Sequence, residues 1–135
     1  YFEPEEFHGW YDQLNPDLFR KLNLFRHEWG DIVNVSGNHD SVGRRLGSND
    51  DSSHNVDRWG QVNAVDIFPA GMNTISDMQR AEAIARKVGF TGIGLYTDTS
   101  KLMMHVDVRP NRSTDNPATW ARVGFEYVGI DQAYA

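Results

Sequence analysis

The chain has 135 residues, of which 39% are hydrophobic and 12% aromatic, and this is enough for one domain with its own core. The formal net charge is −6 and no basic run is present, which argues against nucleic acid or an anionic membrane surface as a partner. No apolar run approaches the roughly 20 residues that span a bilayer, so we expect no membrane insertion. Because cysteine is absent, disulfides and thiolate metal sites are excluded, and any metal must be held by His, Asp or Glu.

Helices are expected in the first 30 residues. The segment 2–7 has acidic residues in what would be the first turn of a helix. Asn15 followed by Pro16 is typical of an N-cap and a first helical residue, and Gly30 is expected to end this helix. Apolar residues at three- and four-residue spacing predict its inner face: Leu18, Phe19, Leu22, Phe25 and Trp29.

Strands are expected to dominate the rest of the chain. Residues 31–37 predict a short strand, and a polar segment over 38–60 follows it. A loop of this length inside a compact domain is usually functional or disordered. The other elements expected, in chain order, are a strand over 61–68 closed by Pro69, a helix capped by Thr74 or Ser76 and stopped by Gly89, strands over 90–96 and 102–110, a short helix start at Asn116-Pro117, a strand over 122–128 and a tail over 131–135.

This order of elements, helices first and then strands with one inserted helix, favours an α+β fold. We expect one domain over residues 1–135, in which a mostly antiparallel sheet carries helices packed on one side.

The segment 102–110 carries the clearest pattern in the chain. An apolar set alternates with a second set, as a half-buried strand requires. The apolar set is Leu102, Met104, Val106 and Val108, and the second set is Met103, His105, Asp107 and Arg109. Same-face neighbours on a strand lie about 6.6 Å apart, which suits a metal ligand and a general base acting on the metal's bound water. Taken alone, the pattern also fits a solvated sheet face.

Three residues that are far apart in the sequence form a candidate metal-ligand set. His54, Asp66 and His105 supply two imidazoles and a carboxylate, a set that holds catalytic zinc and leaves a fourth position for water. Asp66 interrupts a strand pattern in which Asp is unfavourable, so it needs a partner. Asp107 is the first candidate for the base that activates the water, and Asp98 in the preceding turn is the second.

Four motifs, in their order along the chain, resemble those of the D-Ala-D-Ala carboxypeptidase and phage endolysin zinc peptidases, which share their fold with the hedgehog signalling domain. The motifs are Ser52-Ser53-His54, Ala64-Val65-Asp66-Ile67, Gly92-Ile93-Gly94-Leu95-Tyr96 and His105-Val106-Asp107. The beginning of the chain looks similar as well, in Tyr1-Phe2, Pro16-Asp17-Leu18 and Val35-Ser36-Gly37.

This resemblance implies a hedgehog/D-Ala-D-Ala peptidase-like fold with Zn²⁺ held by His54, Asp66 and His105. The implied substrate is the peptide stem of bacterial peptidoglycan, cut at a bond that involves a D-residue by an endopeptidase or a DD-carboxypeptidase. We expect a monomer that degrades the bacterial cell wall. It would act in the wall, in the periplasm or outside the cell, and a phage could encode it.

The chain departs from the family pattern at several places. Eleven residues (55 to 65) separate His54 from Asp66, more than the family usually has, so an insertion over 55–59 is expected to bulge out. Val62 stands where the family has Gly, and the family's acidic residue shortly before the last His is replaced by methionines.

The family's substrate-binding arginine is also displaced. His39 matches its position, and Arg44 and Arg45 follow a few residues later. We expect a cation from this loop, His39 or Arg44, to stabilise the oxyanion of the reaction.

Two other functions remain open on the sequence. Gly37-Asn38-His39-Asp40 after a strand is a signature of two-metal phosphoesterases, although the other motifs of those enzymes are missing. The second alternative is a binding module, either a metal-bearing peptidase fold with weak or no turnover or an acidic loop over 49–53 that holds calcium.

Overall fold

The computed structural model describes all of residues 1–135. Its α-helices are Pro16–Trp29 (α1), Val56–Trp59 (α2) and Ile75–Val88 (α3). Its strands are Val33–Val35 (β1), Ala64–Pro69 (β2), Gly92–Tyr96 (β3), Met103–Asp107 (β4), Ala118–Val123 (β5) and Glu126–Val128 (β6). Its 3-10 helices are Pro4–Phe7 (η1), Tyr11–Gln13 (η2), His39–Ser41 (η3) and Ile130–Tyr134 (η4).

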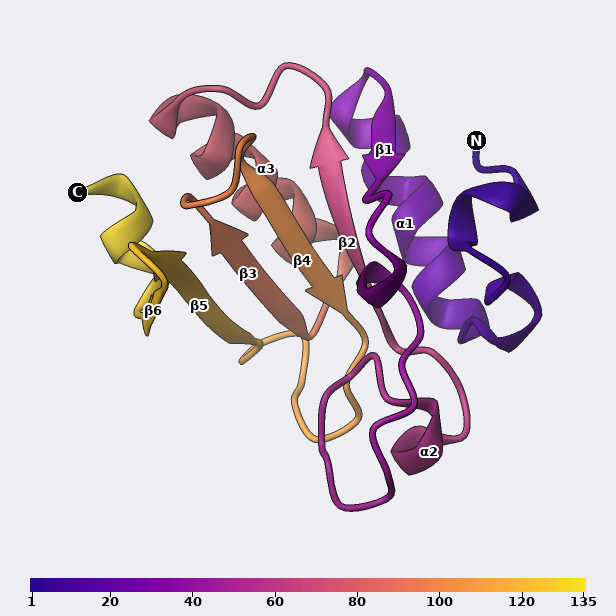
Figure 1. Ribbon diagram of the computed structural model, residues 1–135. Coiled ribbons are helices and arrows are strands. Elements are labelled where there is room, and N and C mark those ends of the chain that lie inside the picture. Colours follow the sequence, from indigo (N-terminus) through magenta and orange to yellow (C-terminus); the bar gives the residue numbers. More distant parts are fainter.

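The six strands form one mixed sheet in the order β1-β2-β4-β3-β5-β6 (Figure 1). Four of the neighbouring pairs are antiparallel, whereas β3 and β5 run parallel to each other. The α+β class is therefore confirmed, and the parallel pair is a feature that the sequence did not predict.

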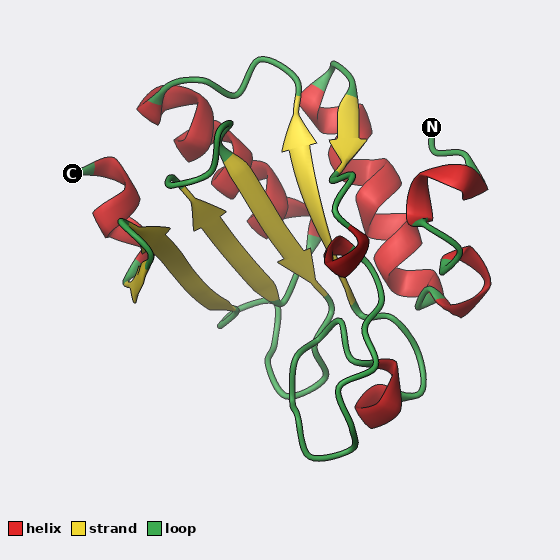
Figure 2. Ribbon diagram, in the orientation of Figure 1, coloured by secondary structure: helices red, strands yellow, loops and turns green.

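The long helices α1 and α3 lie behind the sheet in Figures 1 and 2, and they contact each other there. Between them and the sheet lies the core, to which the strands contribute the apolar half of their alternation. Fully buried side chains in it include Leu22, Phe25, Ala81, Ala85, Val65, Ile67, Ile93, Leu95, Met104 and Val106. The other half of the alternation, with His105 and Asp107, consequently faces away from the helices.

The helix ends follow the predicted capping residues. The Asn15 side chain accepts a hydrogen bond from the Asp17 N–H at the start of α1, and Gly30 ends the helix with φ 79°. Thr74 and Asp77 form a reciprocal capping box at the start of α3. These side chains satisfy backbone N–H groups that a helix leaves without partners, which is why both helices begin where the sequence predicts.

The two ends of the chain correct the prediction. The N-terminal segment forms only the short η1, and the tail forms η4. No helix starts at Asn116-Pro117, because the residues that follow pair with β3 as strand β5. The strand expected over 122–128 is two strands joined at Gly124 and Phe125, whose φ values of 58° and 65° are typical of a tight hairpin turn.

Candidate metal centre

The sheet itself brings two of the three predicted ligands together. In the antiparallel pairing of β2 with β4, Asp66 lies opposite His105, and Ala64 lies opposite Asp107. Side chains that face each other across neighbouring strands have Cβ atoms about 5 Å apart, so the Asp66 carboxylate and the His105 imidazole must meet.

The third ligand comes from the long polar segment, which hydrogen bonds hold in place. The backbone N–H of Arg44 donates to the His54 carbonyl at 2.9 Å, and the N–H of Val56 donates to the Arg44 carbonyl at 2.9 Å. The N–H of Asn63 donates to the Ser53 carbonyl at 3.0 Å, which ties the segment to the chain just before β2. His54 is 3% exposed as a result, although it belongs to a loop.

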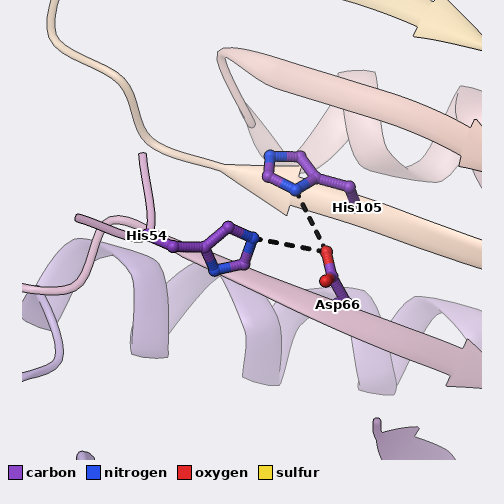
Figure 3. A group of neighbouring side chains, drawn as sticks. All are labelled: His54, Asp66 and His105. Carbon is purple, nitrogen blue, oxygen red and sulfur yellow. Dashed lines mark hydrogen bonds and ion pairs between the residues drawn. The ribbon is translucent and has the colours of Figure 1, made fainter. Parts of the chain in front are cut away.

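The His54 and His105 imidazoles both point toward the Asp66 carboxylate (Figure 3). Asp66 Oδ1 lies 3.5 Å from His54 Nε2 and 3.1 Å from His105 Nδ1. One ligand atom from each residue lies within 4.8 Å of the other two, and all three residues are buried. This group could hold a metal ion, and it is the only such group of three or more His, Asp and Glu residues in the chain.

Each imidazole also has a hydrogen-bond partner on the side away from the group. His54 Nδ1 lies 2.6 Å from the Val42 carbonyl, which can only accept, so the proton is on Nδ1 and Nε2 is left as a ligand. His105 Nε2 lies 2.7 Å from Asp107 Oδ2, which leaves Nδ1 facing Asp66. Histidines that bind metals characteristically donate their second N–H to a carbonyl or a carboxylate in this way.

Asp107 is completely buried and fully engaged. Beside its contact with His105, its oxygens accept from the Arg109 backbone N–H at 3.1 Å and from Arg109 Nη2 at 2.6 Å. Gly92 makes room for it, because a Cβ there would overlap the Asp107 carboxylate. Burial alone would raise the pKa of Asp107, but the hydrogen bonds from His105 and Arg109 outweigh it and hold the pKa well below its usual range.

The same contacts determine the charges of the ligand group in the protein without an ion. Burial alone would lower the pKa of His105, yet its hydrogen bonds with Asp107 and Asp66 raise it to about 9. Burial would raise the pKa of Asp66, and its hydrogen bonds with His105 and His54 lower it instead. Without an ion, a protonated His105 thus balances part of the negative charge of Asp66 and Asp107, and the Nδ1 proton must leave before His105 can bind a metal.

The group opens into a polar cleft of about 870 Å³. Three arginines contribute to its wall: Arg44, Arg109 and Arg122. Arg109 is paired with Asp107 and Arg122 with Asp98, whereas no carboxylate pairs with Arg44, whose Nε donates to the Asp40 carbonyl. Arg44 is therefore the cleft cation whose charge is not already neutralised.

The remaining predicted site residues lie in different surroundings. Asp98 does not line the cleft: it accepts from Arg122 Nε at 3.0 Å and from the Phe125 N–H at 2.7 Å, and so fixes the β5–β6 turn. The His39 side chain is 90% exposed and also lies outside the cleft. Of the two residues predicted to stabilise an oxyanion, His39 and Arg44, only Arg44 lines the cleft.

The contacts of Asp107 change the interpretation of this residue. It was expected to activate water, but it lies on the far side of the His105 ring and is not part of the cleft wall. Its geometry suits a carboxylate that orients His105. The signal in the sequence was Gly92, which shares a register row with Asp107 and has no side chain to fill the space.

Tyr96 and Trp120 are among the cleft residues that the sequence did not predict. In the sheet, one row joins Asp66, His105, Gly94 and Trp120 on four neighbouring strands. A Cβ at Gly94 would lie 2.6 Å from the Trp120 ring, so this glycine lets the indole reach the His105 ring, 5.0 Å away between centroids. The parallel β3–β5 pair produces this contact, and no local pattern indicates it.

The fold and its cleft thus define a candidate metal centre of two imidazoles and one carboxylate. No protein-family model, no curated protein and no solved structure matches the chain. None of its helices combines the length and the apolar character that crossing a membrane requires.

Proposed function

We propose that this chain is a zinc-dependent hydrolase that cleaves the peptide stem or cross-link of bacterial peptidoglycan. The observation that carries the proposal is the convergence of His54 Nε2, Asp66 and His105 Nδ1, with the other nitrogen of each imidazole already hydrogen-bonded. The resemblance of the surrounding motifs to the D-Ala-D-Ala carboxypeptidase and endolysin zinc peptidases supports the choice of substrate.

The donor set suits zinc. Two neutral imidazoles and one carboxylate are ligands that zinc accepts, and three protein ligands leave a position for water, as in catalytic sites. When bound, zinc would polarise a carbonyl and lower the pKa of water to about 7.

The residues of the chain would divide the remaining work. Asp107 holds the His105 ring so that Nδ1 faces the ion, and the Val42 carbonyl does the same for His54 Nε2. Arg44 supplies an uncommitted positive charge in the cleft wall, where it would bind the oxygen that becomes negative or a carboxylate of the peptide.

The experiment loads the purified protein with zinc, incubates it with purified peptidoglycan and identifies released peptides by mass spectrometry. Wild type is expected to bind one zinc per chain and to release stem-peptide fragments, and a chelator should stop the reaction reversibly. His54→Ala is expected to lose both zinc and cleavage. His27→Ala is the matched control, because its ring lies in another part of the molecule, where Nδ1 contacts the Tyr1 hydroxyl. A protein that binds no zinc would contradict the proposal.

A second candidate is a metal-bearing binding module with little or no turnover. It is favoured by one observation: the two carboxylates expected to activate water, Asp107 and Asp98, lie outside the cleft wall and are each paired with an arginine. Zinc binding without peptide release would support this candidate.

The phosphoesterase interpretation finds no support in the same geometry. The Asn38 side chain accepts from the Asp40 N–H and caps η3, and His39 is exposed. His39 belongs to no group of three or more His, Asp and Glu residues that could hold a metal ion.

A further inference from the structure

Contacts from two neighbouring side chains, Trp120 and Arg122, hold the Tyr96 ring and its hydroxyl in the cleft wall. Its Oη accepts a hydrogen bond from Trp120 Nε1 at 3.1 Å, and the Trp120 ring lies 5.0 Å from the His105 ring. The Arg122 guanidinium covers the Tyr96 ring, 4.9 Å from its centroid, and Asp98 holds that guanidinium. Tyr96 is therefore built into the cleft one indole away from a metal ligand.

We propose that the Tyr96 hydroxyl is a catalytic residue that donates a hydrogen bond to the negatively charged oxygen formed when water adds to the scissile carbonyl. This inference rests on the proposed hydrolase function. In the step, water would enter as hydroxide, after its proton has passed to the solvent; its oxygen–carbon bond forms as the carbonyl π bond breaks, and that electron pair moves to the carbonyl oxygen, which the Tyr96 O–H would face. The hydroxyl keeps its proton, so the residue contributes electrostatic stabilisation and no group is transferred to it.

The chemistry of the hydroxyl supports this role. Burial, followed by the nearby Tyr127 and Asp66, raises the pKa of Tyr96 to about 12, while Trp120 acts in the opposite direction. Tyr96 consequently stays neutral and keeps a proton to donate. Since Trp120 supplies the hydrogen bond that Oη accepts, the O–H can turn from the neighbouring Tyr127 toward a ligand in the cleft, which both tyrosines line.

The arrangement of the donor also suits catalysis. A donor that is already oriented costs no reorganisation at the moment of reaction, and the loss of one such donor typically lowers kcat by about 10²- to 10³-fold. Arg44 would face the same oxygen from the loop, so the two residues would supply a charged and a neutral donor from different elements.

The first test removes one oxygen atom, in Tyr96→Phe. We expect kcat on a soluble peptidoglycan fragment to fall about 10²-fold or more with KM changed less than about threefold, at unchanged zinc content and thermal midpoint. Tyr11→Phe is the control, since it removes the same atom from a ring that packs on Phe7 and Phe19 and does not line the cleft. Tyr96→Phe with kcat within threefold of wild type overturns the proposal, as does a larger loss in Tyr127→Phe.

The second test does not depend on cleavage. Cobalt(II) replaces zinc, and its absorption spectrum is titrated with inorganic phosphate, a tetrahedral oxyanion. Wild type is expected to bind phosphate about tenfold more tightly than Tyr96→Phe does. Tyr11→Phe is expected to bind phosphate with the affinity of wild type. Equal affinities, no phosphate binding by wild type, or loss of cobalt from Tyr96→Phe each overturn the role of Tyr96. If wild type cleaves no peptidoglycan, the proposed function fails, and the phosphate titration still decides whether Tyr96 serves the metal site.

Discussion

Replacing Asp107 by Asn separates the two roles that this carboxylate could have. The change removes its negative charge and keeps its shape, so the amide oxygen can still accept from His105 Nε2, which now lies 2.7 Å from Asp107 Oδ2. If Asp107 orients His105 and makes it a more basic ligand, the variant binds zinc more weakly. If Asp107 is the base that activates water, the variant binds zinc normally and loses turnover.

The structure favours the first outcome, and its size can be stated. Losing the outer partner of a metal-bound histidine typically weakens metal affinity about 10- to 100-fold. This corresponds to about 1.4 to 2.8 kcal/mol of binding free energy, at about 1.4 kcal/mol for each factor of ten. The effect should lie toward the upper end, because Asp107 is fully buried and the same change leaves Arg109, whose side chain is 25% exposed, without its charged partner.

The assay is competition for zinc with a chelator of known affinity, followed by kcat measured at saturating zinc. We expect Asp107→Asn to need more zinc for half-saturation and to recover most of its kcat once saturated. Asp98→Asn is the matched control for zinc affinity, since its carboxylate binds Arg122 and the Phe125 N–H instead of a ligand. Unchanged zinc affinity with a kcat reduced about 10³-fold would refute the orienting role and restore Asp107 as the base.

Two further predictions follow from the same contacts. Without metal, the free energy of unfolding should be highest between about pH 4 and 6.5. The raised pKa of His105 gives stability that is complete below about pH 6.5 and is lost as the pH rises toward about 9. The lowered pKa values of Asp66 and Asp107 give stability that is lost as the pH falls below about 4. Urea unfolding in chelator at pH 5.5 and 9 measures this, and equal stability at the two values would contradict it. Gly94→Ala should lower the free energy of unfolding by about 1–3 kcal/mol, since its Cβ would lie 2.6 Å from the Trp120 ring, and urea midpoints beside an Ala substitution at the unobstructed Gly37 would reveal it.

The elements that the sequence predicts well are those whose partners are close in the chain. The spacing of Leu18, Leu22 and Phe25 reports burial on one helix face, and Asn15 and Gly30 supply the caps locally. Alternation over 102–110 likewise indicates β4, because its apolar half must enter the core whatever the neighbouring strands are.

The elements that it predicts poorly depend on distant pairing. The sequence of β5 has no clear apolar alternation, and it becomes a strand because its backbone pairs with β3. The sheet order could not be derived for the same reason, and with it the contact of Trp120 with His105. The three candidate ligands could be named from the sequence, whereas the position of Asp107 behind His105 follows only from the orientation of the His105 ring in the folded sheet.

Gly92 and Gly94 bring these arguments together. Glycine in a strand interior costs side-chain packing and conformational entropy, so both residues weaken β3 on local grounds. Each lies beside a β4 residue of the site, Gly92 opposite Asp107 and Gly94 opposite His105. The volume they leave empty is filled by the Asp107 carboxylate in one row and the Trp120 indole in the next. The face of the sheet is therefore hollowed on both sides of His105, where Asp107 and Trp120 contact its ring. Two glycines that bind nothing themselves thus determine how the His105 ring is oriented.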